Sequence, residues 1–146
     1  MRIQKSIEIK ALPEKIWPFL VEPENILKWC LTFKKFEYSS DKNSGTGITF
    51  YVEEKASGPL MKLNFIVTEW IVNEKLAFKM TSGTGVKEYR QVWSLKTTSI
   101  GSTFTFFEEV VLPLGFIGKL IGTFLKKSSE AHVDKMLTEL KNLSEV

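Results

Sequence analysis

Cysteine and histidine are almost absent from this sequence of 146 residues, which contains one of each. A lone Cys30 excludes a disulfide framework, because every disulfide bond needs two cysteines. Cys30 and His132 together are too few to supply the nitrogen and sulfur ligands of a structural zinc ion. We therefore expect neither a metal nor another cofactor, and a fold that its hydrophobic core stabilises.

Long hydrophobic runs and charge of one sign are also missing. The most apolar stretch, residues 110–125, contains Pro113 and Lys119 and is shorter than the ~20 residues of a transmembrane helix. The N-terminal residues alternate charged side chains with isoleucine, unlike the apolar core of a secretory signal. The net charge is only +3, without the concentrated basic face of a nucleic-acid-binding protein. We expect a cytoplasmic protein that binds no nucleic acid.

Aromatic residues, by contrast, make up 12% of the chain, and hydrophobic residues make up 43%. Burial of this much apolar surface can offset the conformational entropy lost on folding, which excludes a disordered chain. A chain of this length is large enough for one hydrophobic core. We predict a single domain that spans residues 1–146.

The N-terminal part of the sequence predicts one strand followed by two short helices. The first segment places Ile3, Ile7 and Ile9 on one face, which Lys5 interrupts, and polar residues on the other face. This period of two is typical of a half-buried strand. Two later prolines, each followed directly by a glutamate, then occupy positions typical of the first turn of a helix.

From residue 32 to residue 111 the period of two dominates. Segments rich in Gly, Ser, Asn and Pro separate six candidate strands, and connections this short join antiparallel neighbours. The candidate strands are residues 32–38, 47–55, 60–70, 75–81, 86–96 and 102–111.

A long amphipathic helix is predicted to begin near residue 116 and to end near residue 143. Leu125, Val133, Met136 and Leu140 lie on its apolar side, and charged residues lie on the other side. The inner face of the sheet is the only apolar surface that can cover this stripe. The sequence therefore predicts an α+β fold with an antiparallel sheet curled around the C-terminal helix.

Several segments resemble the START-like, polyketide cyclase/dehydrase and lipid-transport superfamily, also called SRPBCC. They are residues 7–17, 22–29, 101–105, 115–118 and 137–141. The resemblance implies the helix-grip fold, in which a curved seven-stranded antiparallel sheet wraps around a long C-terminal helix, with two short helices after strand 1. It also implies an apolar cavity between the sheet and the helix. Members bind or carry lipids, sterols and polyketides, and a minority catalyse cyclisation or dehydration.

Strand faces predict one polar cluster on the inward side of the sheet. Tyr89, Gln91 and Trp93 share a face of one strand, and Phe106 and Glu108 share a face of the next strand. In a hairpin of these strands, Glu108 lies opposite Tyr89 or Gln91. A carboxylate on an aromatic face needs a hydrogen-bonding partner or a raised pKa, so the cluster is a candidate for holding a polar ligand group. The alternative is that Glu108 reaches water at the cavity mouth.

Aromatic residues on inward faces are candidates both for the core and for the wall of a ligand site. His132 lies on the flank of the helix stripe, where it could reach a cavity, although a single histidine is more often a packing residue. A nucleophilic pair of Cys30 and His132 lacks any local signature, and we assign no catalytic residue. The predicted ligand-binding residues are Trp29, Phe36, Phe50, Phe65, Phe78, Tyr89, Gln91, Trp93, Phe106, Glu108, Leu125 and His132.

The glycine-rich start of the long helix has two interpretations. Glycine weakens a helix by about 1 kcal/mol relative to alanine, so this segment could form a flexible gate that touches a membrane or an incoming ligand. The gate residues would be Phe116, Gly118, Leu120 and Gly122. Alternatively, the glycines allow close packing of the helix on the sheet.

Three hypotheses for the function follow. The first is binding or transport of a hydrophobic small molecule, such as a lipid, an isoprenoid or a polyketide-like compound, with transient membrane contact. The second is a cyclase or dehydratase in which Glu108, Tyr89 or His132 transfers protons. The third is a protein-interaction module that uses the apolar surface of residues 116–125.

Overall fold

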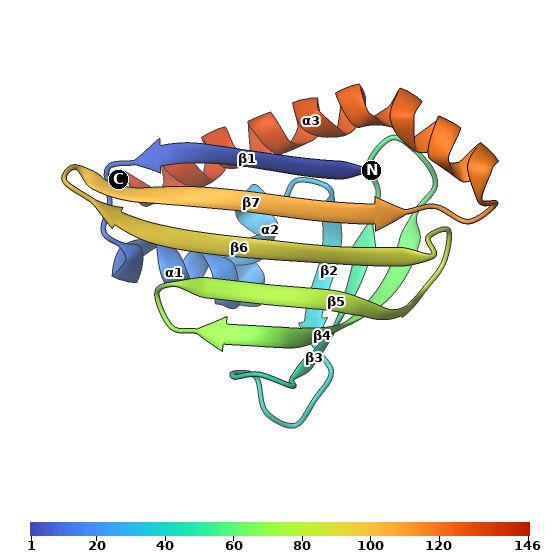
Figure 1. Cartoon of the computed structure of the whole chain (residues 1–146). Helices are drawn as coiled ribbons and strands as arrows, with labels where there is room; N and C mark the ends of the chain where they lie inside the picture. The colour runs from blue at the N-terminus through green and yellow to red at the C-terminus, as the bar shows by residue number, and fades with distance from the viewer.

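The computed structural model describes all 146 residues of the chain, apart from the side chain of Phe116. Its strands and helices follow one another in the predicted order (Figure 1). The strands are β1 (Arg2–Ile9), β2 (Phe33–Tyr38), β3 (Thr49–Glu54), β4 (Met61–Ile71), β5 (Lys75–Gly83), β6 (Glu88–Thr98) and β7 (Gly101–Val111). The helices are α1 (Pro13–Val21), α2 (Pro23–Trp29) and α3 (Phe116–Ser144).

The strands form one seven-stranded sheet in the order β1-β7-β6-β5-β4-β3-β2. From β2 to β7 each strand pairs antiparallel with the next strand in the sequence, and β1 pairs antiparallel with β7 at the far edge. Short connections produce this arrangement, because they leave no room for a crossover helix. The predicted α+β helix-grip fold is confirmed.

The sheet curls strongly enough to bring together strands that are not neighbours. Tyr89 on β6 donates a hydrogen bond of 2.8 Å to Glu54 on β3, although β5 and β4 lie between these strands. A flat sheet would separate them by three strand spacings, each of about 4.8 Å. The curl therefore creates a concave inner surface, and α3 runs along it (Figure 1).

The C-terminal half of α3 packs tightly into this surface. Leu137 and Leu140 are buried in the same hydrophobic core as the inner faces of the strands. Lys5, which interrupts the isoleucine face of β1, donates a hydrogen bond of 2.7 Å to Asp134 on α3. The charged residue in the apolar face of β1 is thus paired with the helix.

Helices α1 and α2 cover the end of the concave surface near the C-terminus of α3 (Figure 1). Each helix begins at the predicted proline, where the missing N–H needs no partner. Ile16 and Leu20 on α1 and Trp29 on α2 have no exposed surface. The Trp29 indole N–H donates a hydrogen bond of 2.7 Å to the Phe19 carbonyl oxygen, which ties the two helices together.

Aromatic rings form a continuous chain through the core next to these helices. The ring centroids of Trp29 and Trp93 are 4.9 Å apart, and those of Trp93 and Phe78 are 5.2 Å apart. Phe50 continues the chain, at 5.1 Å from Phe78 and 4.7 Å from Phe36. Rings at these distances fill the space between them, so this part of the molecule is closed.

Over the residues that the structure describes, none of the helices combines the length and the hydrophobicity that a membrane span requires. Within the same residues, His, Cys, Asp and Glu side chains form no group of three that could hold a metal ion.

Candidate functional site

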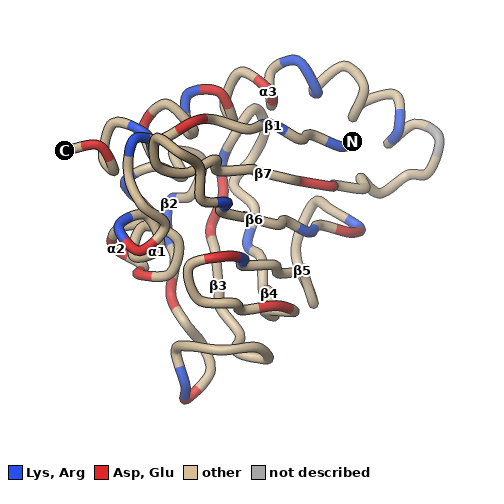
Figure 2. Tube along the Cα trace, turned by 60° about the vertical axis from the view of Figure 1, so that its left-hand side comes forward, with Lys and Arg blue, Asp and Glu red and all other residues tan. Residues whose placement is uncertain are grey.

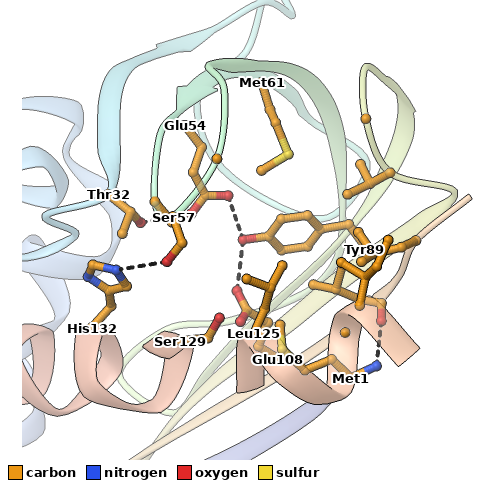
Figure 3. Close-up of a pocket in the computed structure, with 18 of the residues that line it drawn as sticks. Met1, Thr32, Glu54, Ser57, Met61, Tyr89, Glu108, Leu125, Ser129 and His132 are labelled. Carbon is orange, nitrogen blue, oxygen red and sulfur yellow. Dashed lines mark hydrogen bonds between the residues drawn. The ribbon is translucent and has the colours of Figure 1, made fainter. Parts of the chain in front are cut away.

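A cavity of about 340 Å³ lies between the N-terminal half of α3 and the sheet. The start of β6 and the end of β7 form its inner wall. The loop between β3 and β4, the N-terminal Met1 and the connector between β7 and α3 complete it (Figure 3). Its volume lies in the range of small-molecule sites, which are usually about 300–1,000 Å³.

Small residues on opposite walls leave this space open. Ala56 and Gly58 lie in the loop between β3 and β4, and Gly118, Gly122 and Ser129 face the cavity from α3. None of these side chains extends further than a hydroxymethyl group, so a space remains between the helix and the loop beside the hydrogen bond of Ser57 to Ser128. The rest of the wall is mainly apolar, as ligand sites usually are.

One polar cluster interrupts the apolar wall, and the Tyr89 hydroxyl is at its centre (Figure 3). This oxygen lies 2.8 Å from Glu54 Oε1 and 2.8 Å from Glu108 Oε1. All three side chains are buried, with at most 8% of their surface exposed. Because Glu54 Oε1 and Glu108 Oε1 both lie 2.8 Å from the same hydroxyl oxygen, they can be no more than twice that distance apart. Their surroundings are mainly apolar.

Neighbouring side chains fix the geometry of this cluster. Gln91 Nε2 donates hydrogen bonds of 2.9 Å to Glu108 Oε1 and to the Tyr89 hydroxyl. The Trp93 indole N–H donates to Gln91 Oε1 at 2.7 Å, which sets the orientation of the amide. Thr32 Oγ1 donates to Glu54 Oε2 at 2.7 Å. Each carboxyl group of the cluster is therefore held by a further side chain besides Tyr89.

A count of protons shows that the two carboxyl groups share one. Tyr89 has a single hydroxyl proton and can donate it to Glu54 or to Glu108. The second contact of 2.8 Å then needs another proton, which lies on the other carboxyl group. One of the two glutamates is therefore protonated in this arrangement, as in other sites where like charges meet.

Burial favours the same protonation. Burial, the largest cause, and the nearby charge of Glu54 raise the pKa of Glu108, whereas the hydrogen bonds from Tyr89 and Gln91 lower it, and the net pKa is about 7. Burial also raises the pKa of Glu54. A buried carboxyl group with a pKa near neutrality can donate or accept a proton under physiological conditions.

His132 lies at another part of the cavity wall. Its Nε2 is 3.5 Å from Ser57 Oγ, and Ser57 is in turn hydrogen-bonded to Ser128 at 2.8 Å. Cys30 is fully buried, and burial raises the pKa of its thiol, so a reactive thiolate is disfavoured. The structure gives no support to a nucleophilic pair of these two residues.

The structure places the predicted ligand-binding residues in two groups. Those in the cavity wall are Tyr89, Gln91, Phe106, Glu108, Leu125 and His132. Those that pack in the aromatic core and do not line the cavity are Trp29, Phe36, Phe50, Phe65, Phe78 and Trp93. The second group has inward faces, as predicted, but it lies where α1, α2 and the rings themselves fill the space.

The predicted register of the last hairpin is confirmed, since Gln91 lies directly opposite Glu108. The polar cluster contains one further carboxyl group, Glu54, that the sequence analysis missed. Its signal was present, because Phe50, Val52 and Glu54 alternate along β3 and share its buried face.

The predicted gate residues divide in a similar way. Gly118 and Gly122 line the cavity, and Leu120 is 47% exposed and does not. The Phe116 side chain lies outside the described residues. A methyl group on Gly118 would come within 2.2 Å of the Pro113 carbonyl oxygen, so close packing explains this glycine, although it packs against the connector between β7 and α3 and not against the sheet. Gly122 has ordinary van der Waals space around it.

Comparison with known proteins identifies the family. The family described as polyketide cyclase / dehydrase and lipid transport matches residues 1–145. No curated protein sequence matches this chain.

Solved structures share the fold over almost the whole chain. A Thermus thermophilus protein, TTHA0849, is 16% identical, with a TM-score of 0.82 over 99% of this chain and 97% of that one. The Zhui aromatase/cyclase of Streptomyces sp. R1128 is 10% identical, with a TM-score of 0.81 and coverages of 99% and 93%. A START superfamily protein of Mycobacterium smegmatis is 17% identical, with a TM-score of 0.74 and coverages of 99% and 97%.

Proposed function

Because this chain belongs to the polyketide cyclase / dehydrase and lipid transport family, we propose that its cavity binds a hydrophobic small molecule. A lipid, an isoprenoid or a polyketide-like compound would suit the site. The main support is the cavity of about 340 Å³, whose apolar wall carries a single buried polar cluster at Tyr89, Gln91 and Glu108. The apolar wall would contribute affinity, at about 25 cal/mol per Å² of buried surface, and the cluster would orient the polar end of the ligand.

The first test is native mass spectrometry of freshly purified protein, followed by solvent extraction of any bound compound. Ser129→Phe places a large ring in the cavity and should abolish the bound mass. Ala131→Phe is the matched control, because Ala131 lies on the exposed side of the same helix. Retention of the compound by Ser129→Phe would place it outside the cavity and refute the proposal.

One observation also supports an enzyme of the cyclase or dehydratase type. The pair of Glu54 and Glu108 holds a proton that a ligand in the cavity could reach, and His132 lies on the same cavity wall. General acid–base catalysis typically contributes about 10²–10⁴-fold to a rate. Once a ligand is identified, Glu108→Gln separates the two functions: a carrier keeps binding with altered affinity, whereas an enzyme loses most of its turnover.

The exposed apolar residues near the start of α3 suit the proposed gate and a transient membrane contact. Leu114 is 72% exposed, Ile117 59% and Phe124 84%. The charged residues between positions 112 and 129 are all lysines, and Figure 2 shows no acidic residue in the first turns of α3. Lysines beside apolar side chains favour anionic lipid surfaces. Sedimentation with anionic vesicles should therefore decrease for Phe124→Ser and stay unchanged for Thr103→Ser on the sheet.

A further inference from the structure

The cavity wall carries two carboxyl groups, and no lysine or arginine lines it among the described residues. On the premise that the cavity binds small molecules, we propose that it selects ligands whose polar head donates a hydrogen bond to Glu108 Oε2. A protonated amine is the preferred head, a hydroxyl comes next, and a carboxylate is rejected.

Glu108 Oε2 is the acceptor in this cluster that the protein leaves free. Both oxygens of Glu54 are engaged, Oε1 with the Tyr89 hydroxyl and Oε2 with the Thr32 hydroxyl. Glu108 Oε1 is held by Tyr89 and Gln91, and within the described part of the chain Oε2 has no hydrogen-bond partner. Glu108 is only 8% exposed and lines the cavity, so the donor for Oε2 comes from the cavity, either from water or from a ligand group that displaces it.

Glu108 Oε2 remains a hydrogen-bond acceptor whichever of the two carboxyl groups holds the shared proton. When Glu54 is protonated, Tyr89 donates to Glu108, which is a carboxylate. When Glu108 is protonated, its proton lies on Oε1, on the contact of 2.8 Å to Tyr89. A ligand group that meets Oε2 must therefore supply the hydrogen itself.

The charges around the cluster point to the same ligand class. Cys30 is a buried neutral thiol, and His132 is hydrogen-bonded to Ser57 at another part of the wall. The Met1 amino group donates to the Val110 carbonyl oxygen, and its attraction is the smallest of the effects that act on the pKa of Glu108. The cluster thus keeps an excess negative charge, which attracts a cationic head. A carboxylate head would add a further negative charge to a desolvated site.

Four probes with the same naphthalene body test the head preference by calorimetry or by competition in native mass spectrometry. They are 1-naphthylmethylammonium, 1-naphthylmethanol, 1-ethylnaphthalene and 1-naphthoate. We expect the amine to bind roughly tenfold or more tightly than the ethyl compound, because a hydrogen bond to a charged group is involved. The alcohol should fall between them, and the carboxylate should bind most weakly.

The pH dependence in the unmodified protein is a second readout. Between pH 6 and pH 8 the amine remains cationic and the carboxylate anionic, while the shared proton leaves the cluster. Amine affinity should therefore increase over this range, and carboxylate affinity should decrease. Equal binding of amine and carboxylate at pH 8 would overturn the proposal.

Two glutamine variants of nearly the same side-chain shape show which carboxyl group causes the preference for the amine. Glu108→Gln should abolish the advantage of the amine and leave 1-ethylnaphthalene unaffected. Glu54→Gln is the matched control, because it keeps Glu108 bonded to Tyr89 and Gln91 and should retain the preference for the amine. Unchanged amine preference in Glu108→Gln refutes the head selection alone. Failure of every probe to bind, or binding that Ser129→Phe does not reduce, refutes the proposed cavity function itself.

Discussion

The two halves of α3 meet the same sheet in opposite ways. The closed half, residues 130–144, buries Leu137 and Leu140 in a core that the aromatic rings and α1 and α2 complete. The open half, residues 116–129, faces the sheet with Gly118, Gly122 and Ser129 and leaves a cavity of about 340 Å³. One continuous helix forms both halves, so side-chain size determines where the fold is filled and where it is hollow.

The outer surfaces of the two halves differ as well. The open half exposes Ile117 and Phe124, with lysines as its only charged residues, whereas the outer side of the closed half carries Asp134, Lys135 and Thr138. A helix face that is apolar toward solvent contributes little to the stability of the domain. The closed half therefore anchors the fold, and the open half is the part to which we assign the proposed function.

The largest expected difference between the halves concerns stability. Trp29→Ala removes a fully buried indole that packs on Trp93 and Phe104, and it should destabilise the protein by about 3–5 kcal/mol. Leu125→Ala in the open half should cost about 1 kcal/mol, because this side chain already borders empty space. Urea denaturation measures both changes. Equal losses would show that the cavity is filled in solution.

The second largest effect is the dependence of stability on pH. The pKa of Glu108 in the folded protein is about 7, above its ordinary value of 4.5, so the folded state binds more protons in this range. The resulting contribution, about 3 kcal/mol, is fully present below pH 4.5 and is lost as the pH rises through 7. Denaturation between pH 5 and pH 8 should show this loss.

Two variants test the origin of that slope. Glu108→Gln should flatten it, because the glutamine does not titrate. The neighbouring Glu109→Gln is the control, since Glu109 lies on the outer face beside Arg2 and Arg90, which lower its pKa. If the stability of Glu108→Gln still depends on pH between pH 5 and pH 8, another titratable group causes the dependence.

The third effect distinguishes close packing from a hinge at the start of α3. Gly118→Ala would place a methyl group 2.2 Å from the Pro113 carbonyl oxygen and should destabilise the protein by about 1–3 kcal/mol. Gly122→Ala meets no atom closer than 3.8 Å and should stabilise the helix by up to about 1 kcal/mol. Thermal denaturation shows whether each variant is more or less stable than the unmodified protein. A Gly118→Ala variant that is more stable would contradict the close-packing interpretation.

The sequence was sufficient for the fold and for part of the site, because both depend on local patterns. Alternation assigned the inner faces of β6 and β7, and a short turn fixed their register, so the contact of Gln91 with Glu108 was predictable. Prolines marked the starts of α1 and α2. These features depend on neighbouring residues and on pairs of adjacent strands.

The remaining parts of the site depend on distances across the whole fold. Glu54 meets Tyr89 only because the sheet curls past two intervening strands, and no pairing rule predicts the amount of curl. Phe50 and Phe106 both have inward faces, but only Phe106 lines the cavity. The positions of α1, α2 and α3 determine which of the inward rings borders empty space. The alternation of residues along a strand does not predict these positions.

The smallest expected effect concerns Lys5, which joins the sheet to α3 near the boundary between the two halves. Its ammonium lies 2.7 Å from Asp134 and 3.8 Å from Glu130, and the Asp134 side chain is 60% exposed. Water screens an ion pair of this kind, so Lys5→Met, which keeps the aliphatic stem, should cost less than about 1 kcal/mol. Lys5→Ala should cost more, because it also removes the stem from the isoleucine face of β1. Urea denaturation at low and high salt separates the two contributions, since salt should abolish the cost of Lys5→Met and leave that of the stem. A loss of several kcal/mol in Lys5→Met would instead show that this ion pair, and not the buried leucines of the closed half, holds α3 to the sheet.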